Sequence, residues 1–197
     1  MAISRTEIVN KALTLVGASP IVNIDDEAEN ARVVNRVYEI SLKSALSETA
    51  WTFALRRKLL SQVTDTLEWY DPGETYVYQK PNECIRIFRA NNPNTIWREL
   101  GEFVVSDTTG LGVEYVYFLN TPSKYPPSFV EAFVDKLCAD IAFMILNSKT
   151  VAETFLEKYE KVSLAKALAE NSQIGIPHYQ KDDAWELAKQ GSNNFEV

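Results

Sequence analysis

The feature that most constrains the fold is a change in the spacing of apolar residues, which occurs twice along the chain. Apolar residues recur at intervals of three and four over residues 1–61 and again over 126–171, as in amphipathic helices. Over 62–125, β-branched and aromatic residues alternate or cluster in short runs between turn-forming residues. We therefore expect an α+β fold, mainly α, with about four helices in a bundle and an antiparallel β insert of about four strands. An extended C-terminal arm over 172–197 follows.

The first helical segment carries recognisable start and stop signals. Ser4 and Glu7 have the S-x-x-E spacing of a capping box, and Gly17 offers the left-handed residue that ends a helix. Asp25 or Asp26 can cap a second helix, where a carboxylate also suits the positive helix end.

The second helix is expected to be long. No Gly or Pro interrupts residues 26–53, which allows a helix of about 25 residues. Trp51 and Phe53 close this stretch, and bulky aromatic side chains there would hold the helix end against the segment that follows.

Three consecutive basic residues, Arg56, Arg57 and Lys58, come next. Such a run can contact DNA from the wall of a channel. It can also be the exposed end of a helix, where positive charge offsets the helix dipole. We favour the helix end, because three residues fall short of the usual basic patch.

The second helical segment repeats the capping signals. Ser128 with Glu131, and Thr150 with Glu153, again have capping-box spacing, and Asn147 separates the two predicted helices. The first of these helices has apolar residues over more than half of its surface, which predicts a central helix packed on both sides.

Composition excludes several classes of protein. The net charge of −7 argues against a protein that clamps DNA phosphates over its whole surface, although like charge would let DNA slide past. The polar N-terminus indicates no signal peptide, and no apolar run approaches the ~20 residues of a membrane span. Cys84 and Cys138 lack metal-ligand spacing. We expect a soluble protein made in a reducing cytoplasm, with no membrane contact.

The sequence offers little for catalysis. His178 is the one histidine, and no phosphate-binding or zinc-protease motif occurs. The acidic residues of 25–29 could bind a cation, but the start of a helix explains them better. A cation site at Asp182 and Asp183 is disfavoured in the same way. We expect no catalytic residue, no metal site and no cofactor.

Four motifs occur in a fixed order: Ala12-Leu-x-Leu-x-Gly17-x-x-Pro20, Asn30-Ala31-Arg32, Trp51-Thr52-Phe53 and Tyr76-x-Tyr78-x-x-Pro81-x-x-Cys84-x-Arg86. In this order they resemble the tail tubular protein A family, the head-to-tail adaptors of short-tailed bacteriophages. The resemblance covers roughly the first three quarters of the chain.

The resemblance implies a structural virion protein at the head-tail junction. About twelve copies would form a ring below the portal protein, connect it to a nozzle of the tail tubular protein B type, and leave a channel for DNA ejection. DNA would pass without specific binding. Arg56, Arg57 and Lys58 are the candidate channel-facing residues. The aromatic residues Tyr179, Trp185 and Phe195 are candidate contacts to a neighbouring subunit or the portal, or they could pack back on their own domain.

Two other functions remain open at this stage. A tail-associated hydrolase acting on a cell-wall or surface polysaccharide would need a pair of carboxylates, and acidic residues are abundant, but no pair stands out. A helical regulatory DNA-binding protein is disfavoured by the acidic isoelectric point near 4.9 and the lack of a basic stripe.

Overall fold

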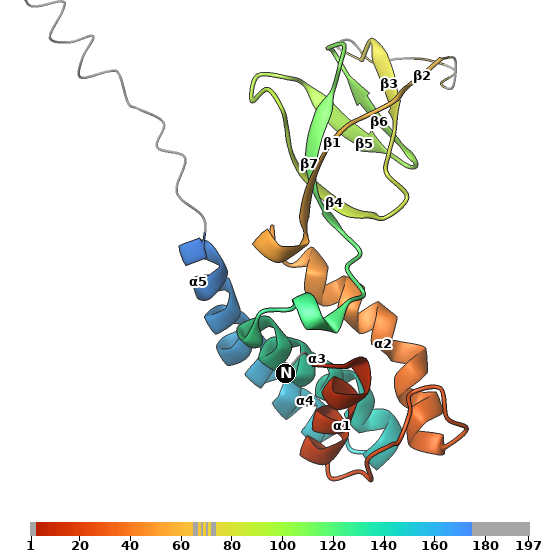
Figure 1. The fold of residues 1–197 in the computed structure, drawn as a ribbon, viewed down its shortest axis with the longest axis vertical. Helices are drawn as coiled ribbons and strands as arrows, with labels where there is room; N and C mark the ends of the chain where they lie inside the picture. Colours follow the sequence, from red (N-terminus) through yellow and green to blue (C-terminus); the bar gives the residue numbers. More distant parts are fainter. Residues whose placement is uncertain (1–2, 65–66, 68, 70, 72–73, 175–197) are drawn as a thin grey trace, which may run out of the picture.

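The computed structural model describes residues 3–64, 67, 69, 71 and 74–174, and the elements named below are those of that part of the chain. Helices α1 and α2 come first, seven short strands follow, and helices α3, α4 and α5 complete the order. Figure 1 shows the helices gathered at one end of the molecule and the strands at the other. The structure confirms the predicted α+β class, with antiparallel sheets inserted between two helical segments.

Helix α1 (Arg5–Leu15) begins at the predicted capping box. The Ser4 Oγ accepts a hydrogen bond from the Glu7 N–H at 3.1 Å, and the Glu7 carboxylate accepts one from the Ser4 N–H at 2.6 Å. Gly17 follows the helix with a φ of 79°, which is the left-handed conformation expected of a glycine at a helix end. The predicted start and end of this helix are both confirmed.

Two asparagine side chains hold the loop between α1 and α2 (Glu29–Ser47). The Asn10 amide donates to the Ile21 C=O and accepts from the Ile21 N–H, both at 2.8 Å. The Asn30 side chain donates to the Ser19 C=O at 3.0 Å. These bonds satisfy backbone groups that belong to neither helix, so the loop has a defined path.

The start of α2 differs from the prediction. The helix begins at Glu29 and no side chain caps it, so neither Asp25 nor Asp26 has the capping role expected of it. The Asp26 carboxylate instead accepts the Asn23 N–H at 2.9 Å and closes a turn within the loop. An aspartate that bonds its own turn is then unavailable to the helix.

Helix α2 ends at Ser47, well before the predicted Phe53. The Trp51 indole N–H donates to the Ala45 C=O at 2.9 Å, and Arg86 Nη1 donates to the Ser47 C=O at 3.4 Å. These side chains occupy carbonyls that the N–H groups of a further helical turn would otherwise use. The helix therefore ends without Gly or Pro, and the predicted length was wrong.

Four aromatic rings pack where the helices meet the sheets, and we call Trp51, Phe53, Tyr125 and Phe129 the aromatic joint. The ring centroid of Phe129 lies 5.0 Å from that of Trp51, 4.8 Å from Phe53 and 5.2 Å from Tyr125. The Tyr125 hydroxyl also donates to the Leu119 C=O at 2.6 Å. The joint thus binds together the segments that enter and leave the strand region, as the aromatic pair predicted.

The strand region holds two antiparallel sheets. A three-stranded sheet has the order β1-β7-β4, and a four-stranded sheet has the order β2-β3-β6-β5. The strands are β1 (Leu55–Leu59), β2 (Gln62–Val63), β3 (Tyr76–Gln79), β4 (Cys84–Ala90), β5 (Trp97–Leu100), β6 (Phe103–Ser106) and β7 (Gly112–Tyr117), and 3-10 turns cover Thr52–Ala54 and Pro122–Lys124. The sheets begin earlier than residue 62, because β1 takes the residues that we expected to end a helix. That expectation was wrong.

Helix α3 (Pro127–Leu146) is the central helix. It packs against α1, α2, α4 and α5, and its buried residues lie on several sides, as its wide apolar surface predicted. It begins next to Pro126 without a side-chain cap, so the predicted Ser128–Glu131 box does not form. Asn147 ends the helix with a φ of 50°, which agrees with the predicted break.

The last helix is continuous. Its parts are α4 (Lys149–Lys158), a π turn (Tyr159–Ser163) and α5 (Leu164–Ile174). Ser148 is its N-cap and accepts the Val151 N–H at 3.4 Å, so the predicted box of Thr150 and Glu153 is wrong.

The end of α5 is tied to the joint. The Asn171 side chain accepts the Thr52 N–H at 2.9 Å and donates to the Ala50 C=O at 3.1 Å. The helix continues to Ile174, past the residue at which we predicted the C-terminal arm to begin.

Within the described residues, no helix combines the length and the apolar character that a membrane crossing requires. Cys84 and Cys138 are free thiols. Burial raises the pKa of Cys84 to about 11 and that of Cys138 to about 12, so both hold little reactive thiolate near neutral pH.

Candidate interaction surface

Positive charge is concentrated in the three-stranded sheet. Its strands carry five Lys or Arg residues and one acidic residue, Glu114, which gives a formal charge of +4 in a chain whose net charge is −7. Strand β1 contributes the basic run noted in the sequence, and β4 adds Arg86 and Arg89. The sheet therefore gathers positive charge from segments that are distant in the sequence, although the run on β1 is short.

The strand geometry divides the predicted group of three basic residues between two faces. Because side chains alternate along a strand, Arg57 lies on one face of β1, and Arg56 and Lys58 lie on the other. Arg56 forms an ion pair with Glu83, and its guanidinium lies 3.5 Å from the centroid of the Tyr117 ring. The three residues do not present one common basic surface.

Arg57 belongs instead to a row of charges that crosses the sheet, and we call Arg57, Glu114 and Arg89 the charged row. Both arginines lie opposite Glu114 in the strand register. Arg57 Nε lies 2.5 Å from Glu114 Oε2, and Arg89 lies at 2.8 and 3.1 Å from the two carboxylate oxygens. The hydrogen bonds from Arg89, with those from Arg57, hold the pKa of Glu114 below its ordinary value despite partial burial.

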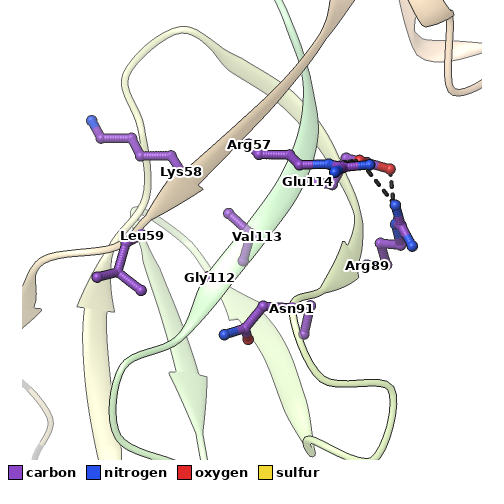
Figure 2. A pocket seen from close by; sticks show the side chains of 9 residues that line it. Arg57, Lys58, Leu59, Arg89, Asn91, Gly112, Val113 and Glu114 are labelled. Carbon is purple, nitrogen blue, oxygen red and sulfur yellow. Dashed lines mark hydrogen bonds and ion pairs between the residues drawn. The ribbon is translucent and has the colours of Figure 1, made fainter.

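A hollow of about 420 Å³ lies beside the charged row. Figure 2 shows Leu59 and Asn91 on either side of Gly112, and Lys58 and Arg57 extending in opposite directions from β1. The Asn91 side chain packs closely against Gly112, because a Cβ at residue 112 would lie only 3.1–3.3 Å from its atoms. Leu59, at 67% exposed, forms an apolar rim. The hollow thus combines arginine side chains with an apolar edge.

The four-stranded sheet has no comparable surplus of charge. Its strands contain one basic and one acidic residue, Arg98 and Glu99. Arg98 lies 2.7 Å from an Asp71 oxygen and 2.5 Å from a Glu74 oxygen, and Glu99 pairs with Lys80. Each charge there is balanced by a neighbour.

Sequence reasoning missed Arg89 and Glu114 as members of this surface. The only signal was Glu114 itself, a charged residue in an otherwise apolar and aromatic strand. Its two arginine partners follow from the strand register, which the sequence does not display. Arg86 was expected at a sheet surface and is exposed there.

The remaining predicted sites give no surface of this kind. Tyr179, Trp185 and Phe195 lie outside the described residues. The acidic residues of 25–29 lie exposed in the loop before α2 and at its first residue, Glu29, and no group of His, Cys, Asp or Glu that could hold a metal ion occurs in the part of the chain that the structure describes.

Comparison with known proteins assigns no family. No protein-family model matches the sequence, and no curated protein matches it at significant similarity.

Proposed function

We propose that this protein is a structural virion component, a head-to-tail adaptor similar to tail tubular protein A. Copies of the chain assemble into a ring beneath the portal, connect it to the tail nozzle, and leave a channel through which DNA is ejected. The protein acts by forming interfaces and transforms no substrate. Like charge on neighbouring acidic copies would keep DNA from adhering to the channel wall.

The observation that carries this proposal is the position of the residues on which the resemblance rests. Gly17 turns the chain out of α1, and Asn30 holds the following loop. Trp51 ends α2, and Arg86 attaches β4 to the same helix end. One residue of each motif thus lies at a connection between elements and fixes its path, and the four motifs belong to one continuous part of the fold.

Exposed apolar side chains on the helical part support a role in assembly. Ile40 of α2 is 70% exposed, and Phe143 and Met144 of α3 and Val162 of the π turn are also exposed. Such residues on several helices are suited to contacts between subunits packed side by side.

The alternative of a hydrolase receives no support from the carboxylates. A glycosidase needs one carboxyl group whose pKa is raised, so that it can donate a proton. Hydrogen bonds instead lower the pKa of four carboxylates among the described residues, Glu7, Glu114, Glu131 and Glu157.

The proposal is tested by mixing the purified chain with the portal protein of the same phage. Mass photometry and electron microscopy should show a ring of about twelve copies on the portal, since symmetric oligomers repeat one interface. Ile40→Glu should reduce ring formation, whereas Thr109→Glu, on the exposed turn before β7, adds the same charge and should not. A chain that never joins the portal, or that degrades a polysaccharide as an isolated monomer, would refute the adaptor role.

A further inference from the structure

Strand β1 is an edge strand whose outer side is open. It stands at the end of the order β1-β7-β4, and no other strand of the described residues pairs with it. The Leu60 N–H donates to the Leu111 C=O at 2.8 Å, which sets the alternation of hydrogen bonds along the ladder. Arg56 and Lys58 therefore direct their backbone groups toward β7. Arg57 and Leu59 direct theirs toward the open edge.

The side chains at this edge include one that discourages pairing with another strand and one that favours contact with a partner. Charged residues commonly keep edge strands from pairing with other chains, and Arg57 could do this. An exposed leucine beside a hollow has the opposite effect, because it favours contact with another apolar group. Leu59 and the hollow thus indicate a surface that accepts a partner.

We infer that the open edge of β1, the charged row and the adjoining hollow bind an extended acidic peptide segment of a partner protein. The segment adds a strand to β1, so that the backbone groups of Arg57 and Leu59 gain partners. Its carboxylates meet Arg57 and Lys58, and an apolar side chain enters the hollow over Gly112. This inference goes beyond the adaptor role and does not depend on it, because the surface exists in the single chain.

Charge complementarity selects an acidic segment. Arg57 uses its Nε for Glu114, and among the described residues its two Nη groups have no hydrogen-bond partner. Lys58 likewise forms no ion pair within the part of the chain that the structure describes, and it extends away from the charged row (Figure 2). Carboxylates of a bound strand would supply the missing partners on both faces of β1.

The same geometry favours a peptide over duplex DNA. Glu114 neutralises one of the two charges of Arg57 and Arg89, so the charged row presents a net charge of +1 and no continuous stripe of cations. A hollow of about 420 Å³ accommodates a few side chains, and its Leu59 rim offers nothing to a phosphate. DNA-binding surfaces present projecting donors to phosphate oxygens instead.

The test is fluorescence anisotropy with the full chain and a labelled twelve-residue peptide of three Glu-Glu-Val-Thr repeats, which as an extended strand places Glu on both faces and Val on one of them beside a Glu. Binding is expected, and a peptide with Lys in place of Glu should not bind. The double substitution Arg57→Gln with Arg89→Gln should weaken binding at least about tenfold, because charge-assisted bonds are lost. The double substitution Lys80→Gln with Arg98→Gln removes the same charge beside the other sheet; it is the matched control and should leave the affinity unchanged.

A second pair of variants tests the edge separately from its charge. Leu59→Pro removes the backbone N–H that faces outward and keeps the bonds to β7, whereas Leu59→Ala keeps that N–H. Proline should weaken binding about tenfold more than alanine if a strand is added. Thermal unfolding identifies a proline variant that fails to fold, and the arginine pair then still decides the outcome.

Three results would overturn the inference. Equal losses from the double arginine variant and from Lys80→Gln with Arg98→Gln would indicate unspecific charge attraction. A twelve-base-pair duplex that binds more tightly than the peptide, with no effect of Leu59→Pro, would identify a nucleic-acid surface. Tighter peptide binding after Asp182→Asn, Asp183→Asn and Glu186→Gln together would mean that the chain's own acidic residues occupy the site.

Discussion

The aromatic joint and the charged row both connect strands to something else, but they differ in burial. The joint packs Trp51 and Phe129 out of contact with water, and its polar atoms bond to backbone carbonyls. In the charged row, Arg57 is 76% exposed, although the carboxylate between the arginines is mostly covered. Buried rings stabilise the fold through packing, whereas exposed ion pairs contribute little to stability. The joint therefore serves the architecture, and the row is free to serve binding.

The largest effect is expected at the joint. Trp51→Ala removes a fully buried ring and the bond to the Ala45 C=O, so the free energy of unfolding should fall by about 3–5 kcal/mol in urea titrations. Trp69→Ala removes the same side chain at a site that is 68% exposed and should change stability little. Similar losses from the two variants would contradict the contrast in burial.

The second prediction concerns how much partly buried side chain–backbone bonds away from the joint contribute to the free energy of unfolding. Asn10→Ala removes both bonds to Ile21 and should lower the free energy of unfolding by about 1–3 kcal/mol, because the Ile21 polar groups lose their partner. Asn120→Ala, at an exposed position, provides the control. An unchanged unfolding midpoint for Asn10→Ala would show that the loop needs no such clamp.

The third test uses pH at the charged row. The pKa of Glu114 is lowered from about 4.5 in the folded protein, so its ion pairs stabilise the fold above pH 4.5. That contribution is lost as pH falls through the lower folded-state pKa. Glu114→Gln should therefore destabilise at pH 7, and the difference from the natural chain should shrink in unfolding titrations toward pH 3. The control Glu102→Gln should show no such trend, and a pH-independent difference for Glu114→Gln would disprove the linkage.

The smallest effect on stability is expected at the exposed arginine of the charged row. Arg57→Gln should change the free energy of unfolding by less than about 1 kcal/mol, because exposed ion pairs are weak. The same substitution should clearly weaken the acidic peptide. A large loss of stability would mean that the row, like the joint, is part of the architecture.

The two sheets show why such a surface is hard to predict. In the four-stranded sheet, the charge of Arg98 is balanced by its carboxylate partners. In the three-stranded sheet, Arg89 of β4 lies opposite Glu114, which also contacts Arg57. The chain carries basic residues in both regions, and only strand order and register decide which of them remain uncompensated.

The residue order alone was sufficient to predict the α+β class, the N-cap of α1 at Ser4, and the breaks at Gly17 and Asn147. These features depend on residues within one or two turns of each other, so apolar spacing and local backbone preference are sufficient to predict them. It did not determine the end of α2, because the Trp51 and Arg86 side chains that take its last carbonyls come from outside the helix.

Long-range strand pairing, in contrast, makes residues 55–59 a strand and separates its three basic residues onto two faces. A helix end and an edge strand have similar local composition here, and the pairing with β7 selects the strand. The charged row depends on a register that joins residues 57, 114 and 89. Such contacts are stabilised by residues that are distant in the chain, so local residue preferences do not predict them.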